Sequence, residues 1–154
     1  MPLEIERKFL VKTESWRGAE EPIRIRQGYL AAGPSLSVRI RRAGEAAFIT
    51  VKGGAGLIRS EYEYPIPVPD ADEMLDLLCT RPLIEKRRHR IAVADALWEV
   101  DEFDGALAGL VVAELELASP DQKIELPDWV GREVTDDPRY LNANLARWGL
   151  PSET

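Results

Sequence analysis

The sequence predicts a mainly β fold of the α+β type: an eight-stranded antiparallel closed β-barrel with a few flanking helices, including a C-terminal helix. Three observations favour it. Short segments that alternate apolar and polar residues recur along the chain, turns with glycine or proline separate most of them, and few segments have helical spacing. About eight antiparallel strands with so few helices would leave exposed edges, which closure into a barrel removes.

The first half of the chain is expected to form five strands. They cover residues 2–12, 23–31, 36–42, 47–52 and 57–68. Short turns, several of them with glycine, join the last four, so we expect an antiparallel meander. The fifth strand should end near its prolines, because proline cannot donate a hydrogen bond to a neighbouring strand.

The second half adds two helices and three strands. Residues 70–80 are expected to be a short helix, because an aspartate can cap the first turn and apolar residues follow at helical spacing. The further strands are expected at residues 81–94, 96–103 and 109–118. In the mixed tail, Asp137 and Pro138 are typical of a helix start, and that helix should run to Arg147.

Length and composition indicate one soluble domain over residues 1–154, with 45% hydrophobic and 31% charged residues. No apolar run is long enough to span a membrane, and the N-terminus lacks a secretory signal pattern. The single cysteine, Cys79, excludes an internal disulfide and fits a cytoplasmic location. A net charge of −7 argues against nucleic-acid binding through a basic surface. A monomer and a homodimer are both compatible with the sequence.

One face of nearly every expected strand is charged when it is read with a period of two. For a single strand, a solvated outer face is the usual explanation. Together, however, the strands segregate charge: the bases are Arg39 and Arg41, then Lys86, Arg88 and Arg90, whereas the acids are Glu61 and Glu63, Glu99 and Asp101, and Glu114 and Glu116. Like charges two residues apart repel, which a purely structural surface has no need to concentrate. A barrel with both clusters inside could satisfy them by binding cations and a polyanion.

The residue types indicate which ligands such an interior could bind. Carboxylates without histidine or cysteine partners suit Mg²⁺, Mn²⁺ or Ca²⁺ better than Zn²⁺. Arginine presents a planar fork that matches phosphate oxygens, and lysine adds a point charge. Acids and bases around one chamber therefore indicate a metal–phosphate ligand, most simply a triphosphate.

At the N-terminus, Glu4-x-Glu6-x-Lys8 resembles the ExExK motif of the CYTH superfamily, the triphosphate tunnel metalloenzymes. Further matching features are RIRQGYL at 24–30, Arg39 with Arg41, Lys52, Glu61 with Glu63, Lys86 with Arg88, and the block VDEFDGALAGLVVAELEL at 100–117. The tail LPDWVGREVTDDPRYLNANLA is also similar to the short bacterial members. The resemblance covers essentially the whole chain.

The resemblance implies a tunnel in which bases bind triphosphate and acids bind one or two divalent metals, Mg²⁺ or Mn²⁺. It places Lys8, Arg39, Arg41, Lys52, Lys86 and Arg88 on phosphate, with Arg59, Arg90 and Tyr29 as weaker candidates for substrate contact. It places Glu4, Glu6, Glu61, Glu63, Asp101, Glu114 and Glu116 on the metal and water side. The catalytic group would be Glu4, Glu6, Lys8, Glu61 and Glu63. For Tyr29, a packed barrel tyrosine is an equal alternative.

The activity that the resemblance implies is metal-dependent hydrolysis of inorganic triphosphate to pyrophosphate and phosphate. Three alternatives stay open: a class IV adenylate cyclase, a thiamine or nucleoside triphosphatase, and a non-catalytic polyphosphate-binding module. The matched carboxylates count against the last, because binding a polyanion needs bases only.

Other residues are expected to have no part in this chemistry. By alternation, Arg7 should point away from the charged face and be dispensable for catalysis. His89 should be an outward or packing residue, and Cys79 should lie in the core. The four tryptophans, Trp16, Trp98, Trp129 and Trp148, are most simply core or helix-docking residues.

Overall fold

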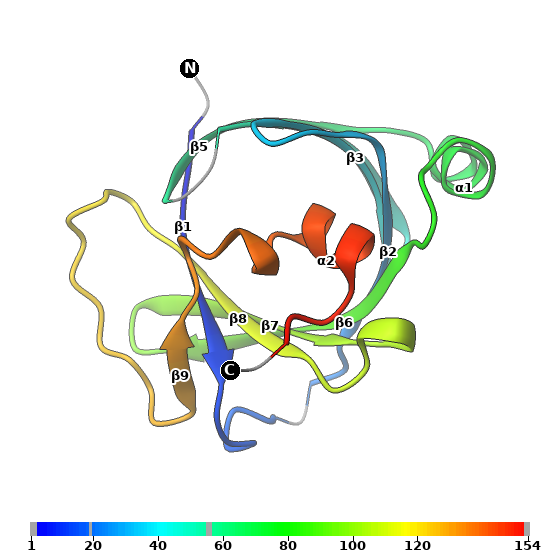
Figure 1. Ribbon diagram of the computed structural model, residues 1–154. Coiled ribbons are helices and arrows are strands. Elements are labelled where there is room, and N and C mark those ends of the chain that lie inside the picture. The colour runs from blue at the N-terminus through cyan, green and yellow to red at the C-terminus, as the bar shows by residue number, and fades with distance from the viewer. Residues whose placement is uncertain (1–2, 19, 55–56, 153–154) are drawn as a thin grey trace.

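The computed structural model describes residues 3–18, 20–54 and 57–152. Its strands form one antiparallel sheet in the order β5-β4-β3-β2-β6-β7-β8-β1-β9, and a further pairing of β1 with β5 closes eight of them into a barrel (Figure 1). The strands are β1 (Leu3–Val11), β2 (Ile23–Ala32), β3 (Leu36–Ala43), β4 (Ala46–Gly53), β5 (Ile58–Pro65), β6 (Ile84–Val93), β7 (Ala96–Phe103), β8 (Val111–Glu116) and β9 (Val130–Glu133). The predicted closed barrel and its β2–β5 meander are confirmed. Residue 2, the first of the expected N-terminal strand, lies outside the described residues.

The hydrophobic core lies largely outside the barrel wall. Phe9, Trp98 and Leu115 on the outer faces of β1, β7 and β8 are covered by Trp16 and Trp129, which come from loops. On these strands the alternation therefore sends apolar residues outward into a covered core and charged residues inward.

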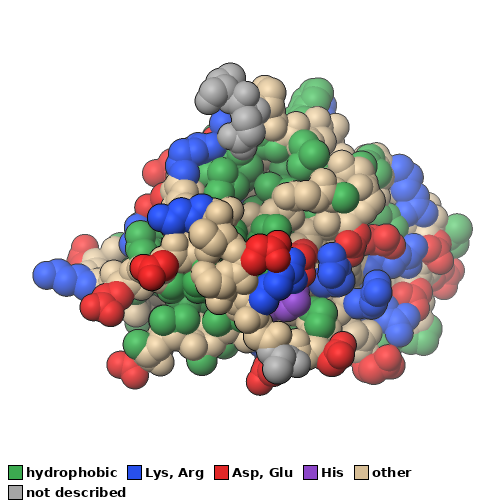
Figure 2. All heavy atoms as spheres, turned by 90° about the horizontal axis from the view of Figure 1, so that it is seen from below, with side chains coloured by type: hydrophobic (Ala, Val, Ile, Leu, Met, Phe, Trp, Pro, Cys, Tyr) green, Lys and Arg blue, Asp and Glu red, His purple; other side chains and the backbone are tan. Residues whose placement is uncertain are grey.

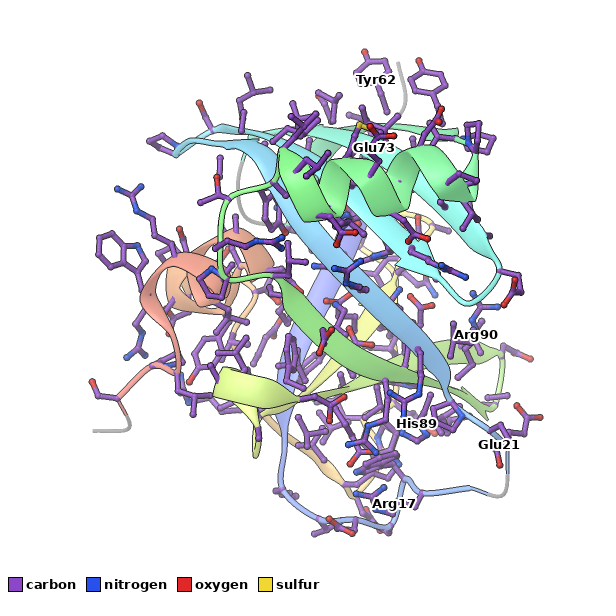
Figure 3. All side chains as sticks on the ribbon, turned by 90° about the vertical axis from the view of Figure 1, so that its right-hand side faces the viewer. Arg17, Glu21, Tyr62, Glu73, His89 and Arg90 are labelled. Carbon is purple, nitrogen blue, oxygen red and sulfur yellow. The ribbon has the colours of Figure 1, made fainter. Side chains whose placement is uncertain are left out.

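Helix α1 (Val68–Leu77) covers a second part of the outer wall, over β3 and β4 (Figures 1 and 3). Its buried residues Ala71 and Leu75 pack with Ile40 of β3 and with Cys79, whose predicted core position is confirmed. The helix begins earlier than residue 70, because Pro67 and not an aspartate takes the N-cap position, without a side-chain cap.

The tail differs from the expected single helix. A 3₁₀ turn, η2 (Pro138–Tyr140), is followed by Leu141 in an extended conformation and then by α2 (Asn142–Trp148). A second 3₁₀ turn, η1 (Gly105–Leu107), precedes β8. In the view of Figure 1, α2 lies within the outline of the ring of strands, and Figure 3 shows it at one end of the barrel. Leu145 holds it there, because this side chain is buried with a cluster from β6, β7 and β8.

Two further expectations about the tail and the tryptophans need correction. Strand β9 was not predicted; its four residues show no alternation and become a strand by pairing with β1. Trp148 was expected to pack but is 71% exposed, whereas Trp16, Trp98 and Trp129 are buried as expected. Among the described residues, no helix has both the length and the apolar character that a membrane crossing requires.

Candidate functional site: a charged tunnel in the barrel

A cavity of about 640 Å³ occupies the interior of the barrel. The charged strand faces point into it, so the solvated outer face that explains most charged strands does not apply here. The predicted site residues that line it are Glu4, Glu6, Lys8, Tyr29, Arg39, Arg41, Lys52, Arg59, Glu61, Glu63, Arg88, Arg90, Glu114 and Glu116. The two remaining ones, Lys86 and Asp101, are each only 1% exposed and do not line the cavity.

The two most deeply buried charges, Lys86 and Asp101, form a group with Arg88. Lys86 Nζ lies 2.8 Å from Asp101 Oδ2, and Arg88 donates from Nε and Nη2 to the two Asp101 oxygens at 2.8 Å and 2.9 Å. Strand register brings this about, because Arg88 of β6 stands directly opposite Asp101 of β7. Burial alone would raise the pKa of Asp101, but the attraction of Lys86 and Arg88 holds it well below its usual range. Both carboxylate oxygens are thus engaged by bases.

Two bases of the barrel interior have lowered pKa values. Burial lowers the pKa of Lys86 to about 7, against the attraction of Asp101. Burial and then the neighbouring charges of Arg39 and Arg88 lower the pKa of Arg41 to about 9. Poor solvation is the main cause of both shifts, and repulsion between the bases adds to it. A bound polyanion would relieve that repulsion.

A second group of ion pairs joins β1, β4 and β5. Lys52 Nζ lies 3.0 Å from Glu4 Oε2 and 3.3 Å from Glu61 Oε2, and Arg59 Nη2 lies 3.5 Å from Glu4 Oε2. Burial would raise the pKa of Glu4, but Lys52 and Arg59 lower it. Burial and repulsion from Glu4 raise the pKa of Glu61 in spite of Lys52.

Two acids on neighbouring strands of the tunnel wall have no ion pair with any residue in the described ranges. Glu6 of β1 stands opposite Glu116 of β8. The pKa of Glu6 is well above its usual range, because burial and then the charges of Glu114 and Glu4 outweigh the attraction of Lys52 and Lys8. The pKa of Glu116 is raised too, first by burial and then by Glu4 and Glu99, in spite of Lys52. A bound cation would relieve the repulsion that these carboxylates exert on Glu6 and Glu116.

The acids fit a divalent metal by their chemistry. All donors are carboxylate oxygens, the ligands that Mg²⁺ and Mn²⁺ prefer. A cation near Glu6 and Glu116 would offset the repulsion that other carboxylates of the wall exert on them. Over residues 3–18, 20–54 and 57–152, however, no three His, Cys, Asp or Glu side chains stand close enough together to hold a metal ion as they are.

Three uncharged residues that bind charged side chains of the site were not among the predicted site residues: Gln27, Thr50 and Asn142. Thr50 Oγ1 donates to Glu63 at 2.8 Å and accepts from Arg39 at 3.2 Å. Gln27 and Thr50 share the strand faces of predicted residues, so alternation could have found them. Asn142 comes from α2, and no local pattern indicates that this helix enters the barrel.

The comparisons with known proteins agree with this geometry. The family model of the CYTH domain matches residues 2–146. The chain belongs to the CYTH domain family. It is 46% identical over 148 residues to an inorganic triphosphatase of Acetivibrio thermocellus, covering 96% of this chain and 95% of that protein. It is 42% identical over 147 residues to an inorganic triphosphatase of Nitrosomonas europaea, covering 93% and 96%. A crystal structure of an inorganic triphosphatase superposes with a TM-score of 0.68 at 37% identity, over 93% of each chain.

His89, which we expected to have no part in the site, lies on the outer face of this CYTH domain barrel. His89 Nε2 lies 2.7 Å from Glu102 Oε1, and its ring packs 4.8 Å from that of Trp16. Figure 3 shows His89 and Arg90 on opposite sides of β6, and Figure 2 shows the histidine at the surface among acidic and basic side chains. The expected packing role of His89 is confirmed. Its partner Glu102 also forms an ion pair with Arg17.

Replacing Arg7 with alanine should leave turnover within about twofold of the unsubstituted CYTH domain protein. Arg7 points outward and forms a two-bond ion pair with Glu133 of β9, both partly exposed. Loss of such a pair costs about 1 kcal/mol of unfolding free energy or less. Steady-state rates and urea unfolding check this, with Lys8→Ala of the neighbouring, inward residue as the comparison. A tenfold fall for the Arg7 variant would show that the outer face takes part in catalysis.

Proposed function

We propose that this protein is a divalent-metal-dependent inorganic triphosphatase that hydrolyses tripolyphosphate to pyrophosphate and phosphate inside the barrel. The observation that carries the proposal is the tunnel itself, in which closely spaced bases and two acids with raised pKa values face one enclosed space. The near full-length similarity to two inorganic triphosphatases supports the choice of substrate.

The bases hold the substrate. A triphosphate carries several negative charges along a short chain, and the cations of the tunnel wall can neutralise them without rearrangement of the backbone. We assign this role to Lys8, Arg39, Arg41, Lys52, Lys86 and Arg88, with Arg59, Arg90 and Tyr29 at the periphery of the same cavity. Lys86 would act from behind the wall, so its contact with phosphate requires a small movement of its side chain or of Arg88.

The acids hold the metal and the water. We assign this side to Glu4, Glu6, Glu61, Glu63, Asp101, Glu114 and Glu116. Glu6 and Glu116 are the strongest candidates, because they have raised pKa values and no ion pair within the described residues. Asp101 would act through Lys86 and Arg88, which engage both of its oxygens. Bound Mg²⁺ or Mn²⁺ would neutralise phosphate oxygens and polarise water. Glu4, Glu6, Glu61 and Glu63 would orient the attacking water in line with a terminal phosphorus. Phosphoryl transfer depends mainly on such alignment and charge neutralisation.

Product analysis with several triphosphates tests the proposal. The protein should release phosphate and pyrophosphate from tripolyphosphate with Mg²⁺ or Mn²⁺, turn over ATP and thiamine triphosphate much more slowly, and stop when EDTA removes the metal. Formation of cyclic AMP from ATP would instead support an adenylate cyclase of this fold. Binding of tripolyphosphate without turnover in either metal would support a non-catalytic module.

A further inference from the structure

The C-terminal segment enters the barrel and meets two of its lysines. Lys8 Nζ, from β1, donates to the backbone oxygen of Tyr140 at 3.1 Å, and Lys86 Nζ, from β6, donates to Asn142 Oδ1 at 3.0 Å. Tyr140 is only 1% exposed. The segment lies across one end of the barrel (Figures 1 and 3), and its bonds to Lys8 and Lys86 join it to β1 and β6.

Each of these lysines has one acid and one neutral acceptor. Lys8 Nζ lies 3.6 Å from Glu114 Oε1, and Lys86 Nζ lies 2.8 Å from Asp101 Oδ2. An ammonium group has three hydrogens to donate. The acid on the wall and the acceptor on the C-terminal segment therefore constrain the direction of each ammonium group. Lys8 keeps one hydrogen for a ligand in the cavity that it lines, whereas Lys86 reaches a ligand only after the small movement described above.

Two hydrogen bonds through Gln27 also link Asn142 to a third base, Arg41. Its Oδ1 accepts from Gln27 Nε2 at 3.1 Å, and Gln27 Oε1 accepts from Arg41 Nε at 2.8 Å. The orientation of both amides is determined by their partners, because lysine and arginine can only donate, so an oxygen must face each of them. Gln27 is fully buried, which makes this chain of bonds costly to leave unsatisfied.

The acceptors on this segment are uncharged. A carboxylate at the same place would hold Lys86 equally well but would cancel part of the charge that a polyanion needs. An amide and a backbone carbonyl orient the bases and leave their charge available.

We infer that Asn142 is a positioning residue for triphosphate binding, which acts with Gln27 and the Tyr140 carbonyl to orient Lys8, Lys86 and Arg41 toward the substrate. The inference rests on the proposed function, since it names the part of the protein that organises the phosphate-binding bases of the same tunnel. It assigns to the C-terminal helix a direct influence on affinity, beyond closing the barrel.

Calorimetric titration of tripolyphosphate into the metal-free protein, in EDTA, isolates the contribution of the bases. Asn142→Ala should weaken binding by about 10- to 100-fold, the usual effect of losing hydrogen bonds to charged groups, while the stoichiometry stays at the unsubstituted value. A purely structural role would instead lower the stoichiometry, through a misfolded fraction, at unchanged affinity. Trp148→Ala, on the same helix but largely exposed, should bind as the unsubstituted protein does.

Asn142→Asp is the second variant, because it keeps the shape and both acceptor contacts and so should fold. It should bind tripolyphosphate at least about tenfold more weakly than the unsubstituted protein, since its carboxylate competes for Lys86. Equal binding by the unsubstituted protein and either Asn142 variant would overturn the inference and leave the proposed function standing. Failure of the unsubstituted metal-free protein to bind would also overturn it, and turnover with Mg²⁺ or Mn²⁺ would decide the proposed function separately.

Discussion

Replacing Asp101 with alanine is expected to lower the free energy of unfolding by about 3–5 kcal/mol and to abolish turnover. Asp101 is the acid shared by Lys86 and Arg88, and both it and Lys86 are 1% exposed. Its removal takes the ion-pair partner from Lys86 and the closest acid from Arg88, which keeps Glu99 at 3.4 Å and Glu114 at 3.9 Å. An uncompensated buried charge costs several kcal/mol. The freed bases would also lose the orientation in which they face the tunnel. Urea unfolding and tripolyphosphate turnover at neutral pH measure the two effects.

The dependence of the unfolding free energy on pH, in the acid range, provides an independent check on Asp101. Its folded pKa lies below the ordinary carboxyl value, so its contribution to stability is present above about pH 4 and is lost as the pH falls through the folded pKa. Asp101→Asn should therefore flatten the loss of stability below about pH 4. Glu114, whose pKa the attraction of Lys8 lowers to about 2 against the effect of burial, continues to contribute in the same direction.

The control for Asp101 is Asp104, which forms a partly exposed ion pair with Arg87 on the outer face. Asp104→Ala should cost about 1 kcal/mol or less, because an exposed pair gains little from its attraction in water. Similar losses for the two variants would mean that a group other than Asp101 compensates the charge of Lys86, contrary to the contacts described above.

Replacing Glu6 with glutamine should have opposite effects on activity and on stability. Turnover should fall by about 100-fold or more, because the variant loses a carboxylate assigned to the metal and water. The metal-free protein should gain about 1 kcal/mol of unfolding free energy at pH 8, because the ionised carboxylate is destabilised by burial and by Glu114 and Glu4. Glutamine keeps the shape and removes the charge.

The pH dependence of this gain in unfolding free energy follows from the direction in which the pKa of Glu6 is shifted. The folded pKa of Glu6 is raised, so ionisation destabilises the folded state as the pH rises above the unfolded value of about 4.3, and the whole cost is present above the folded pKa. The two proteins should therefore have similar stability at pH 4 and diverge at higher pH. Urea unfolding in EDTA across this range measures the difference.

Glu133→Gln is the matched control for Glu6→Gln, because Glu133 lies on the adjacent strand β9 but faces outward. The hydrogen bond from Arg7 lowers the pKa of Glu133, so its loss should slightly reduce stability and leave turnover unchanged. Addition of Mg²⁺ or Mn²⁺ should raise the melting temperature of the unsubstituted protein more than that of Glu6→Gln. An equal rise in both would show that Glu6 does not contact the metal.

Most strand positions could be predicted because a period of two is a local property of the chain. Strand β9 is the exception: Val130–Glu133 has no such period, and it forms a strand only because β1 offers it an edge at Phe9 and Val11. The single helix expected from Asp137 to Arg147 was wrong for a similar reason. Leu141 adopts an extended conformation between η2 and α2, and this break allows Leu145 to pack inside the barrel.

The candidate site was predictable to the extent that alternation sorts side chains by face. It grouped Glu4, Glu6 and Lys8 and separated them from Arg7, and the structure has the same grouping. Alternation cannot say which face is enclosed, and the apolar face of a strand is usually the inner one. Here the charged face is enclosed because loops with Trp16 and Trp129 bury the other one.

The amino-acid sequence alone thus determined which charges share a face and, through its resemblance to a known family, what they are expected to bind. Only the tertiary structure decided which acids have a base beside them and which neutral groups orient the bases. The hydrogen bond between Gln27 and Asn142 joins residues 115 positions apart. No local pattern encodes such a contact, because it depends on barrel closure and on the helix that the barrel then encloses.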